Sequence, residues 1–401
     1  ASRWLEAVLP GENRFDDKRR RPVPHGHCLR CKITSKLREN EKEIIQGINN
    51  AFDEAEASIK RSQDLCLNND FKTSFIYPLT ERKRSLAETA LNEVEIGIAY
   101  TLINVPEINT VSIDQDIVGT DIYNIDTFES IDYEENNFVV YNLLKNGKST
   151  KSYFVTIQEA ELRIIIPVSY QNNTYYAMPL EEDIPRLHLD FPMIGTEELN
   201  LPFVVNSPLF EPTEPRDGVS LMGDDNDTSK INCDILLRAV GLYQLFLSYV
   251  GNAANWSNLY NLARIKPPKK HNWIDEDWFK ENVVSPIRSK LLYTPIVDVV
   301  DGSRISILDE FDEHQVFFPF ADKEDVRQKI WDLSKTLYPQ YIPVKEHINE
   351  WNFIIWKSCH KFTISELSNE IEKKGDLTSL AEFINTDENG AIRYMNEYYD
   401  L

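Results

Sequence analysis

The spacing of hydrophobic residues predicts alternating helices and strands in the first part of the chain. Residues 40–65 form a predicted helix, because apolar side chains recur there at helical intervals (Ile44, Ile48, Phe52, Ala55 and Ile59). Leu86–Leu102 is a second predicted helix. Alternating polar and apolar positions predict short strands at His27–Leu37, Phe71–Leu79 and Thr110–Ile113.

Four further strands are predicted between residues 138 and 180, because turn residues separate short apolar runs. Asn146-Gly147 is a typical hairpin pair, and Gln171-Asn172-Asn173 divides the next two runs in the same way. The predicted strands are Phe138–Lys145, Ser152–Ile157, Leu162–Val168 and Thr174–Leu180. Successive strands with short turns indicate an antiparallel meander.

The second half is predicted to be mostly helical. Thr228 or Ser229 can cap an apolar helix over 230–250 that ends at Gly251-Asn252, and a further helix spans 275–292. Val297–Val300 and Arg304–Leu308 form a predicted hairpin around Asp301-Gly302. Beyond it the predicted helices are 322–338, 343–361, 363–374 and 390–400. Thr363 and Glu366 have the spacing of a capping box, and Gly375 marks the end of that helix.

These patterns define an α+β fold class: an antiparallel sheet with helices on one face, then a mixed middle region, then a mostly helical C-terminal part. The predicted organisation is an irregular N-terminal segment (1–26), an α+β sheet domain (27–200), a proline-rich connecting loop (201–229), a middle α/β region (230–320) and a helical region (321–401).

Charge and composition narrow the classes of partner. The 401 residues include 65 acidic and 43 basic side chains, a formal charge of −22, which repels phosphate backbones and disfavours nucleic-acid binding. Five cysteines, an odd number, favour a reducing cytoplasm over a disulfide framework. The most apolar stretch, Ile231–Val250, contains Asp234, Arg238 and Gln244, so a buried helix is favoured over a membrane span.

Two clusters of basic residues stand out in this acidic chain. One is at positions 18–21. The other, Arg264–His271 with Trp273 nearby, could contact an anionic partner, or it could be a solvated linker between helices, as charge runs usually are.

The N-terminal segment contains residue types that bind zinc. His25, His27, Cys28 and Cys31 are suitable ligand types, but alternation along a strand places Cys28 and Cys31 on opposite faces. No second pair of ligands lies nearby, so a structural role is favoured and no metal site is predicted. The remaining cysteines (Cys66, Cys233 and Cys359) are interpreted as small core residues.

The segments Asp190–Glu197 and Leu201–Gly218 combine prolines and turn residues with apolar residues. The second segment carries Glu214, Arg216 and Asp217 on one loop, where a scaffold can position side chains that remain reachable. These segments resemble the region that follows the nucleotide-binding domain in ATPases of the heat shock protein 90 and sacsin type. Those ATPases belong to the gyrase, histidine-kinase and MutL superfamily, called GHKL. Phe71–Leu79, with the helix Ala87–Leu102 after it, is similar to the same pattern.

The resemblance implies that residues 27–220 are the second half of an ATP-binding domain together with its exit, and that residues 230–401 are middle-region material. It also implies that Arg216 is a remote arginine that reaches the γ-phosphate of ATP, with Glu214 and Asp217 supporting its loop. A guanidinium suits this task because it is permanently charged and can fork onto phosphate oxygens. Alternatively, Arg216 pairs with Glu214, Asp217 or Glu197 and fixes the loop.

The rest of a GHKL nucleotide site is missing from the sequence. Asn50-Ala-Phe-Asp53 looks like the magnesium-binding helix of this superfamily, but Gln46 replaces the carboxylate that would activate water, so a solvated helix face is the favoured interpretation. None of the 14 glycines forms a Gly-x-Gly, as a phosphate cradle would require. We therefore expect no cofactor in this chain alone, and ATP with Mg²⁺ in a longer polypeptide of which it is the downstream part.

Three hypotheses of function follow. The first is a segment of a sacsin-like, chaperone-like ATPase that couples ATP-driven conformational change to a protein partner or to a role in phage defence. The second is a non-enzymatic, acidic protein-interaction scaffold, and the third and least favoured is a metal-dependent enzyme built on His25, Cys28 and Cys31. We expect a cytoplasmic protein that binds a protein partner but not nucleic acid or membrane, and an oligomer is compatible with the sequence.

Overall fold

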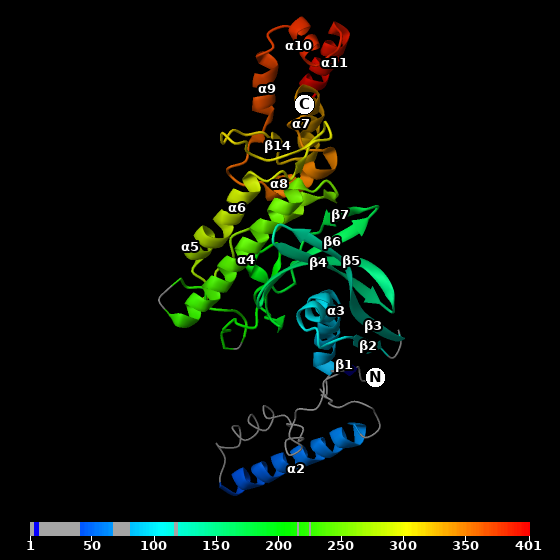
Figure 1. Cartoon of the computed structure of the whole chain (residues 1–401), viewed down its shortest axis with the longest axis vertical. Coiled ribbons are helices and arrows are strands. Elements are labelled where there is room, and N and C mark those ends of the chain that lie inside the picture. Colours follow the sequence, from blue (N-terminus) through cyan, green and yellow to red (C-terminus); the bar gives the residue numbers. More distant parts are fainter. Residues whose placement is uncertain (1–3, 8–40, 67–80, 116–118, 215, 224–225) are drawn as a thin grey trace. The chain divides into compact units, whose positions relative to one another are not determined.

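The chain divides into two compact units. The computed structural model describes residues 4–7, 41–66, 81–115, 119–214, 216–223 and 226–401 (Figure 1). The first unit comprises residues 1–124 and 144–148, and the second comprises 125–143 and 149–401. Several predictions fall outside the described residues, namely the strands His27–Leu37 and Phe71–Leu79, the basic cluster 18–21 and the group His25, Cys28 and Cys31.

Both helices predicted for the first unit are confirmed, as α2 (Glu41–Cys66) and α3 (Glu81–Asn104). The strand predicted at Thr110–Ile113 is β2 (Val111–Gln115), which pairs with the beginning of β3 (Gly119–Tyr133) in a hairpin. The prediction of an irregular segment over 1–26 is wrong at Trp4–Ala7, which forms β1 antiparallel to β2. Local sequence did not show this strand, because its hydrogen-bond partners lie more than a hundred residues away.

The second unit is built on a curled, mainly antiparallel sheet (Figure 1), which confirms the α+β class. Its strand order is β3-β4-β5-β6-β10-β8-β9, with β7 beside β6 and β11 beside β7. The central strands are β4 (Asn136–Lys145), β5 (Lys148–Glu159), β6 (Leu162–Gln171) and β7 (Thr174–Ala177). The predicted turns are confirmed, since Asn146 and Gly147 have φ of 53° and 72°, and Asn172 and Asn173 have φ of 52° and 61°. Positive φ at both central positions defines a type I′ turn.

The segment predicted as the connecting loop 201–229 contributes a buried strand, which corrects that prediction. Val204–Asn206 forms β10, antiparallel to β6 and parallel to β8 (Leu187–Leu189), and β9 (Phe191–Pro192) continues the sheet. Val204 and Val205 are fully buried. The strand was missed because only three residues pair, and prolines on both sides resemble loop punctuation.

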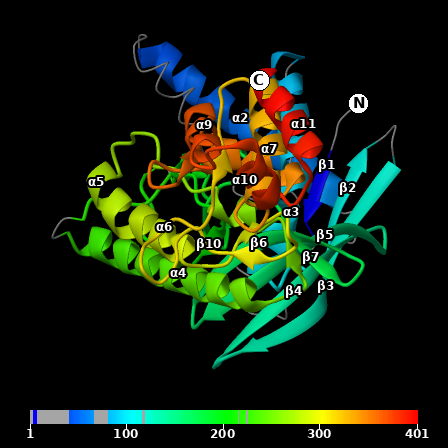
Figure 2. The same cartoon turned by 90° about the horizontal axis from the view of Figure 1, so that it is seen from above.

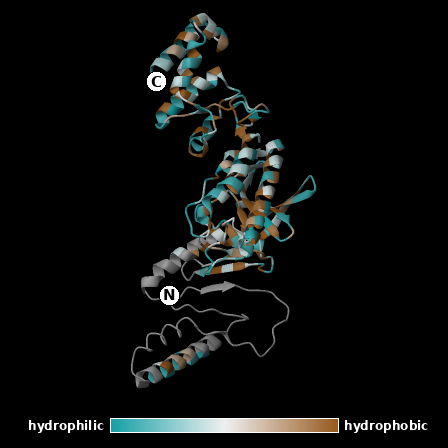
Figure 3. Ribbon diagram, turned by 90° about the vertical axis from the view of Figure 1, so that its left-hand side faces the viewer, coloured by the Kyte–Doolittle hydropathy of each residue, from teal (hydrophilic) through white to brown (hydrophobic). Residues whose placement is uncertain are grey.

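A long helix, α4 (Asp227–Asn252), packs against β6 and supplies much of the core. Its N-cap is Asn226, whose side chain accepts the Thr228 N–H, so the predicted cap at Thr228 or Ser229 is wrong by two or three positions. By length and composition α4 could cross a membrane, but 56% of its most apolar window is buried inside the fold. Figure 3 shows hydrophobic residues gathered in the central strands and the helices beside them.

The helix predicted over 275–292 is present as a single run with a π-type turn in its middle. It comprises α5 (Glu276–Phe279), the turn Lys280–Val284 and α6 (Ser285–Leu292), and α6 lies beside α4 (Figure 2). The short 3₁₀ helices η1 (Glu197–Leu199) and η2 (Leu259–Ala263) and the strand β11 (Trp256–Ser257) connect these elements to the sheet. The predicted hairpin around Asp301-Gly302 is confirmed, with strands β12 (Val297–Asp298) and β13 (Arg304–Ile305).

The C-terminal part is mostly helical, as predicted, with α7 (Glu324–Leu337), α9 (Ile364–Glu372) and α11 (Glu388–Tyr399). The capping box of Thr363 and Glu366 is present. The helix predicted over 343–361 is wrong in extent. It is reduced to η4 (Lys345–His347) and α8 (Ile348–Ile354), because Lys361–Phe362 (β15) pairs with Phe318–Pro319 (β14).

A further helix in this part, α10 (Leu377–Phe383), was not predicted, although Asp376 caps it by accepting the Ser379 N–H. These C-terminal elements share a small core of their own, which contains Ile330, Leu333, Phe362, Leu367, Leu380 and Tyr394.

Candidate functional site

The loop that carries Arg216 is a tight turn closed by its own backbone. Thr213 N–H donates to Gly218 O at 2.8 Å, and Arg216 N–H donates to Thr213 O at 2.6 Å. The Thr213 hydroxyl donates to Asp217 Oδ1 at 2.7 Å. Arg216 has φ of 76°, in the left-handed region that non-glycine residues rarely occupy. Arg216 therefore has an uncommon backbone conformation for a residue with a side chain.

Two contacts at glycines fix this loop to the rest of the unit. A Cβ on Gly195 would lie 2.8 Å from Asp217 O, and a Cβ on Gly218 would lie 2.3 Å from the Trp273 indole. The two segments that carry the family resemblance, Asp190–Glu197 and Thr213–Gly218, are thus in direct contact. Sequence alone could not show this contact, since the two glycines are more than twenty residues apart.

The side chain of Arg216 is exposed and forms no ion pair with any described residue. Glu214 is exposed, Asp217 accepts from Thr213, and the Glu197 carboxylate accepts the Gly195 N–H at 2.7 Å. None of the three carboxylates named as alternative partners thus pairs with Arg216. The loop is held by Thr213 and by the glycine contacts, and the guanidinium is left available.

Replacing Gly195 by alanine is expected to destabilise the second unit by about 2 kcal/mol, because its φ of 110° strains an L side chain and the new Cβ meets a backbone oxygen. Urea unfolding followed by circular dichroism measures this loss. The matched control is Gly241→Ala in α4, where no atom lies within 4 Å of the added Cβ. There alanine is expected to stabilise the helix by up to about 1 kcal/mol. A shift of the same sign in both variants would contradict the role given to Gly195.

The basic segment 264–271 is partly neutralised. Glu198 accepts from Lys269 Nζ at 2.6 Å and lies 2.9 Å from His271 Nε2, and these contacts, that of Lys269 foremost, lower the pKa of its carboxyl. The His271 ring stacks on Trp273, with centroids 5.0 Å apart. Arg264 pairs with Glu350. Lys266 and Lys270 have no ion pair among the described residues, so the segment combines bound and free cations.

The remaining sequence candidates lie on the described helices. Asn50 and Asp53 are exposed on α2, and Gln46 Nε2 donates to Asn50 Oδ1 at 2.8 Å, as on a solvated helix face. Cys233 and Cys359 are buried free thiols, as expected of core cysteines. Within the part of the chain that the structure describes, no group of three His, Cys, Asp or Glu residues could hold a metal ion.

A pocket of about 570 Å³ opens elsewhere in the second unit. Four separate segments line it, 179–182, 200–202, 263–266 and 353–357, together with Arg186 and Arg288. Arg186 is buried and donates to the backbone carbonyls of Glu181 and Ile184, which shapes one side of the pocket. Sequence analysis missed this pocket because its lining is spread over nearly 180 residues and leaves no linear motif.

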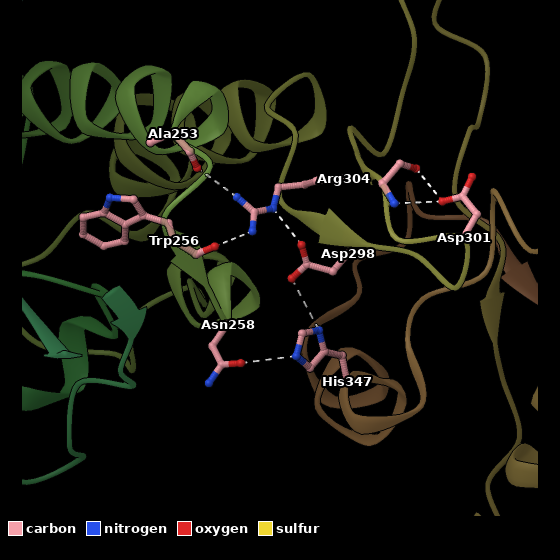
Figure 4. A network of polar contacts seen from close by, with 8 residues as sticks. Ala253, Trp256, Asn258, Asp298, Asp301, Arg304 and His347 are labelled. Carbon is pink, nitrogen blue, oxygen red and sulfur yellow. Dashed lines mark hydrogen bonds and ion pairs between the residues drawn. The ribbon is translucent and has the colours of Figure 1, made fainter. Parts of the chain in front are cut away.

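The polar network in Figure 4 braces the middle of the unit. Arg304 Nε donates to Asp298 Oδ1 at 2.7 Å, and the same guanidinium donates to the carbonyls of Ala253 and Trp256. His347 lies 3.9 Å from Asp298 Oδ2 and 3.2 Å from Asn258 Oδ1. Burial lowers the pKa of His347 and favours its neutral form. Because these polar groups join the β12–β13 hairpin to the end of α4, η2 and η4, we interpret the network as structural.

Comparison of the chain with protein-family models, with curated proteins and with solved structures finds no match.

Proposed function

We propose that this chain is the coupling segment of a sacsin-like, heat-shock-protein-90-like ATPase. In this proposal Arg216 meets the γ-phosphate of ATP held by a GHKL-type nucleotide-binding core, and residues 230–401 relay the resulting change to a protein partner. The observation that carries the proposal is the exposed guanidinium of Arg216, unpaired among the described residues and carried by a loop that contacts Gly195 and Trp273.

This geometry is useful because a γ-phosphate sensor must be rigid in its backbone and free in its side chain. A positioned backbone lowers the entropy cost of ordering the arginine when the ligand binds. An unpaired guanidinium can bind the phosphate without first breaking an ion pair with a carboxylate. ATP bound in the longer polypeptide would favour the arrangement in which Arg216 contacts it, and the population of that arrangement would shift accordingly.

The described residues fit only one part of a nucleotide site. They supply the arginine, whereas no described group of carboxylates or imidazoles could hold Mg²⁺. In this proposal ATP and Mg²⁺ are bound by the longer form, and this chain alone has no nucleotide pocket. A cytoplasmic location, a protein partner and a role in phage defence belong to the same proposal, by analogy with the family.

The test is ATP hydrolysis by a polypeptide that carries this chain together with its nucleotide-binding domain. Arg216→Ala is expected to lower turnover by one to two orders of magnitude, on the order of the cost of losing one charge contact to the transition state. Arg216→Lys is expected to recover part of the loss, since it keeps the charge but not the fork.

The matched control is Arg393→Ala, because Arg393 is also an exposed arginine but lies on α11. Unchanged turnover in Arg216→Ala, or an equal loss in Arg393→Ala, would refute the role given to Arg216. Calorimetric titration of MgATP into the 401-residue chain is expected to give no micromolar binding. Micromolar binding that is retained after Lys266→Gln and Lys357→Gln, and so lies outside the pocket beside Arg288, would place a nucleotide site within this chain.

The second candidate function is a non-enzymatic, acidic protein-interaction scaffold. Its support is the group of large aromatic side chains exposed after residue 300, namely Phe311 (75% exposed), Phe353 (71%) and Tyr399 (75%). Exposed aromatic residues are common anchors of protein interfaces. A longer polypeptide without ATP hydrolysis would favour this scaffold over the coupling segment.

A further inference from the structure

We propose that the pocket beside Arg288 binds a small organic anion, in which a phosphate or carboxylate group is attached to a planar apolar body. This site is independent of the proposed ATPase role, since neither Arg216 nor its loop lines the pocket. The charges around the pocket, the residues that line it and its volume favour such a ligand.

Positive charge is concentrated at this pocket although the whole chain carries −22. Five cationic side chains line it (Arg186, Arg264, Lys266, Arg288 and Lys357), against the two exposed carboxylates of Glu181 and Glu182 and that of Glu350, which pairs with Arg264. Among the described residues, Lys266, Arg288 and Lys357 have no ion pair. Like charges gathered without partners repel one another, and a bound anion would remove that repulsion.

Arg288 is the cation best placed to orient a ligand. Its Nη2 donates to Ile265 O at 3.1 Å, whereas its buried Nε has no acceptor among the described residues. Arg288 is half-buried, and this burial lowers the pKa of its guanidinium. A buried N–H donor without an acceptor raises the free energy of the folded protein, and an oxygen of a bound ligand could accept its hydrogen bond.

The other lining groups favour a ligand that also has an apolar, planar part. Arg288 lies over the Trp356 ring at 5.2 Å, and Trp356 is 8% exposed with an indole N–H that has no acceptor among the described residues. Phe353, which is 71% exposed, adds an accessible aromatic side chain to the lining. The volume of about 570 Å³ is within the range of small-molecule sites, which is roughly 300–1,000 Å³, and exceeds the need of an inorganic ion.

The test is calorimetric titration of the 401-residue chain at low salt with four probes, namely phenyl phosphate, benzoate, inorganic phosphate and phenol. Phenyl phosphate, benzoate or both are expected to bind at one site per chain with a dissociation constant below about 1 mM. Phenol and inorganic phosphate are expected to bind at least about tenfold more weakly, because each lacks one half of the ligand. Binding of only one of the two aryl anions identifies its head group as the preferred one.

Variants locate the site. Lys266→Gln combined with Lys357→Gln changes two exposed side chains. The double variant is expected to keep its fold and to bind the aryl anion about tenfold more weakly. Arg288→Lys is expected to weaken binding of the aryl anion further, because lysine keeps the charge but lacks the paired N–H donors of the guanidinium. The matched control, Lys270→Gln, removes an exposed lysine of the same segment outside the pocket and is expected to leave binding unchanged.

Three results would overturn the proposal: no saturable binding of either aryl anion, equal binding of phenol, or an equal loss in the Lys270→Gln control. None of these results bears on Arg216, whose test is turnover in the longer polypeptide.

Discussion

Replacing Trp256 by alanine is expected to lower the free energy of unfolding of the second unit by about 4 kcal/mol. Trp256 is 1% exposed and stacks on Tyr175 with ring centroids 5.0 Å apart. Phe246 and Tyr249 meet the indole edge-on at 5.4 and 6.1 Å. Removing the indole leaves a cavity among these three aromatic neighbours, which the packed core around them does not fill, so the loss combines hydrophobic transfer with an unfilled volume.

Urea unfolding followed by circular dichroism measures this effect. Trp256→Phe is expected to lose about half as much, because a smaller ring keeps part of the stacking on Tyr175. The matched control is Phe311→Ala, since Phe311 is 75% exposed and its truncation is expected to change stability by no more than about 0.5 kcal/mol. Equal decreases in the free energy of unfolding for Trp256→Ala and Phe311→Ala would contradict the central role of Trp256 in the core.

The second large effect is a loss of stability in acid that originates at His188. His188 lies in β8, is 1% exposed, and burial lowers the pKa of its imidazole from 6.5 to about 4, while a hydrogen bond with the Pro185 backbone opposes this shift. Folding therefore requires the neutral ring. In the unfolded chain the ring binds a proton below pH 6.5, so between pH 6.5 and about 4 the unfolded state holds more protons.

The contribution of the neutral imidazole is fully present above pH 6.5 and is lost as the pH falls towards 4. The difference between the two pKa values corresponds to about 3 kcal/mol. Urea unfolding at a series of pH values should show this loss in the parent chain, and His188→Gln should remove that part of the pH dependence. Parallel decreases in parent and variant from pH 6.5 to 4 would show that other groups cause the acid sensitivity.

Features set by residues close in sequence could be predicted. The turn at Asn146-Gly147 and the capping box of Thr363 and Glu366 each depend on a few neighbouring residues, and both are present. The cap of α4 was misplaced because Asn226, Thr228 and Ser229 are all good cap residues, and local preference does not choose among them.

Features set by distant residues could not be predicted. The extent of the helix predicted over 343–361 depends on the pairing of Lys361–Phe362 with Phe318–Pro319, more than forty residues away. The loop that carries Arg216 was selected from sequence, but its contact with Gly195 and the absence of a carboxylate partner among the described residues required the structure. The pocket beside Arg288 could not be predicted from the sequence, because its lining comes from segments with no common pattern.

The position of β10 also determines when the sheet can complete its strand pairing during synthesis of the chain. Val204–Asn206 lies between β6 and β8, so residues 163–165 keep unpaired backbone groups until residue 206 has left the ribosome. A shortened chain that ends at residue 200 would retain the meander but expose this edge, with Ile164 and Ile165 beside it, to other chains. Such a fragment is expected to self-associate, whereas one that extends through α4 can close its sheet and cover it.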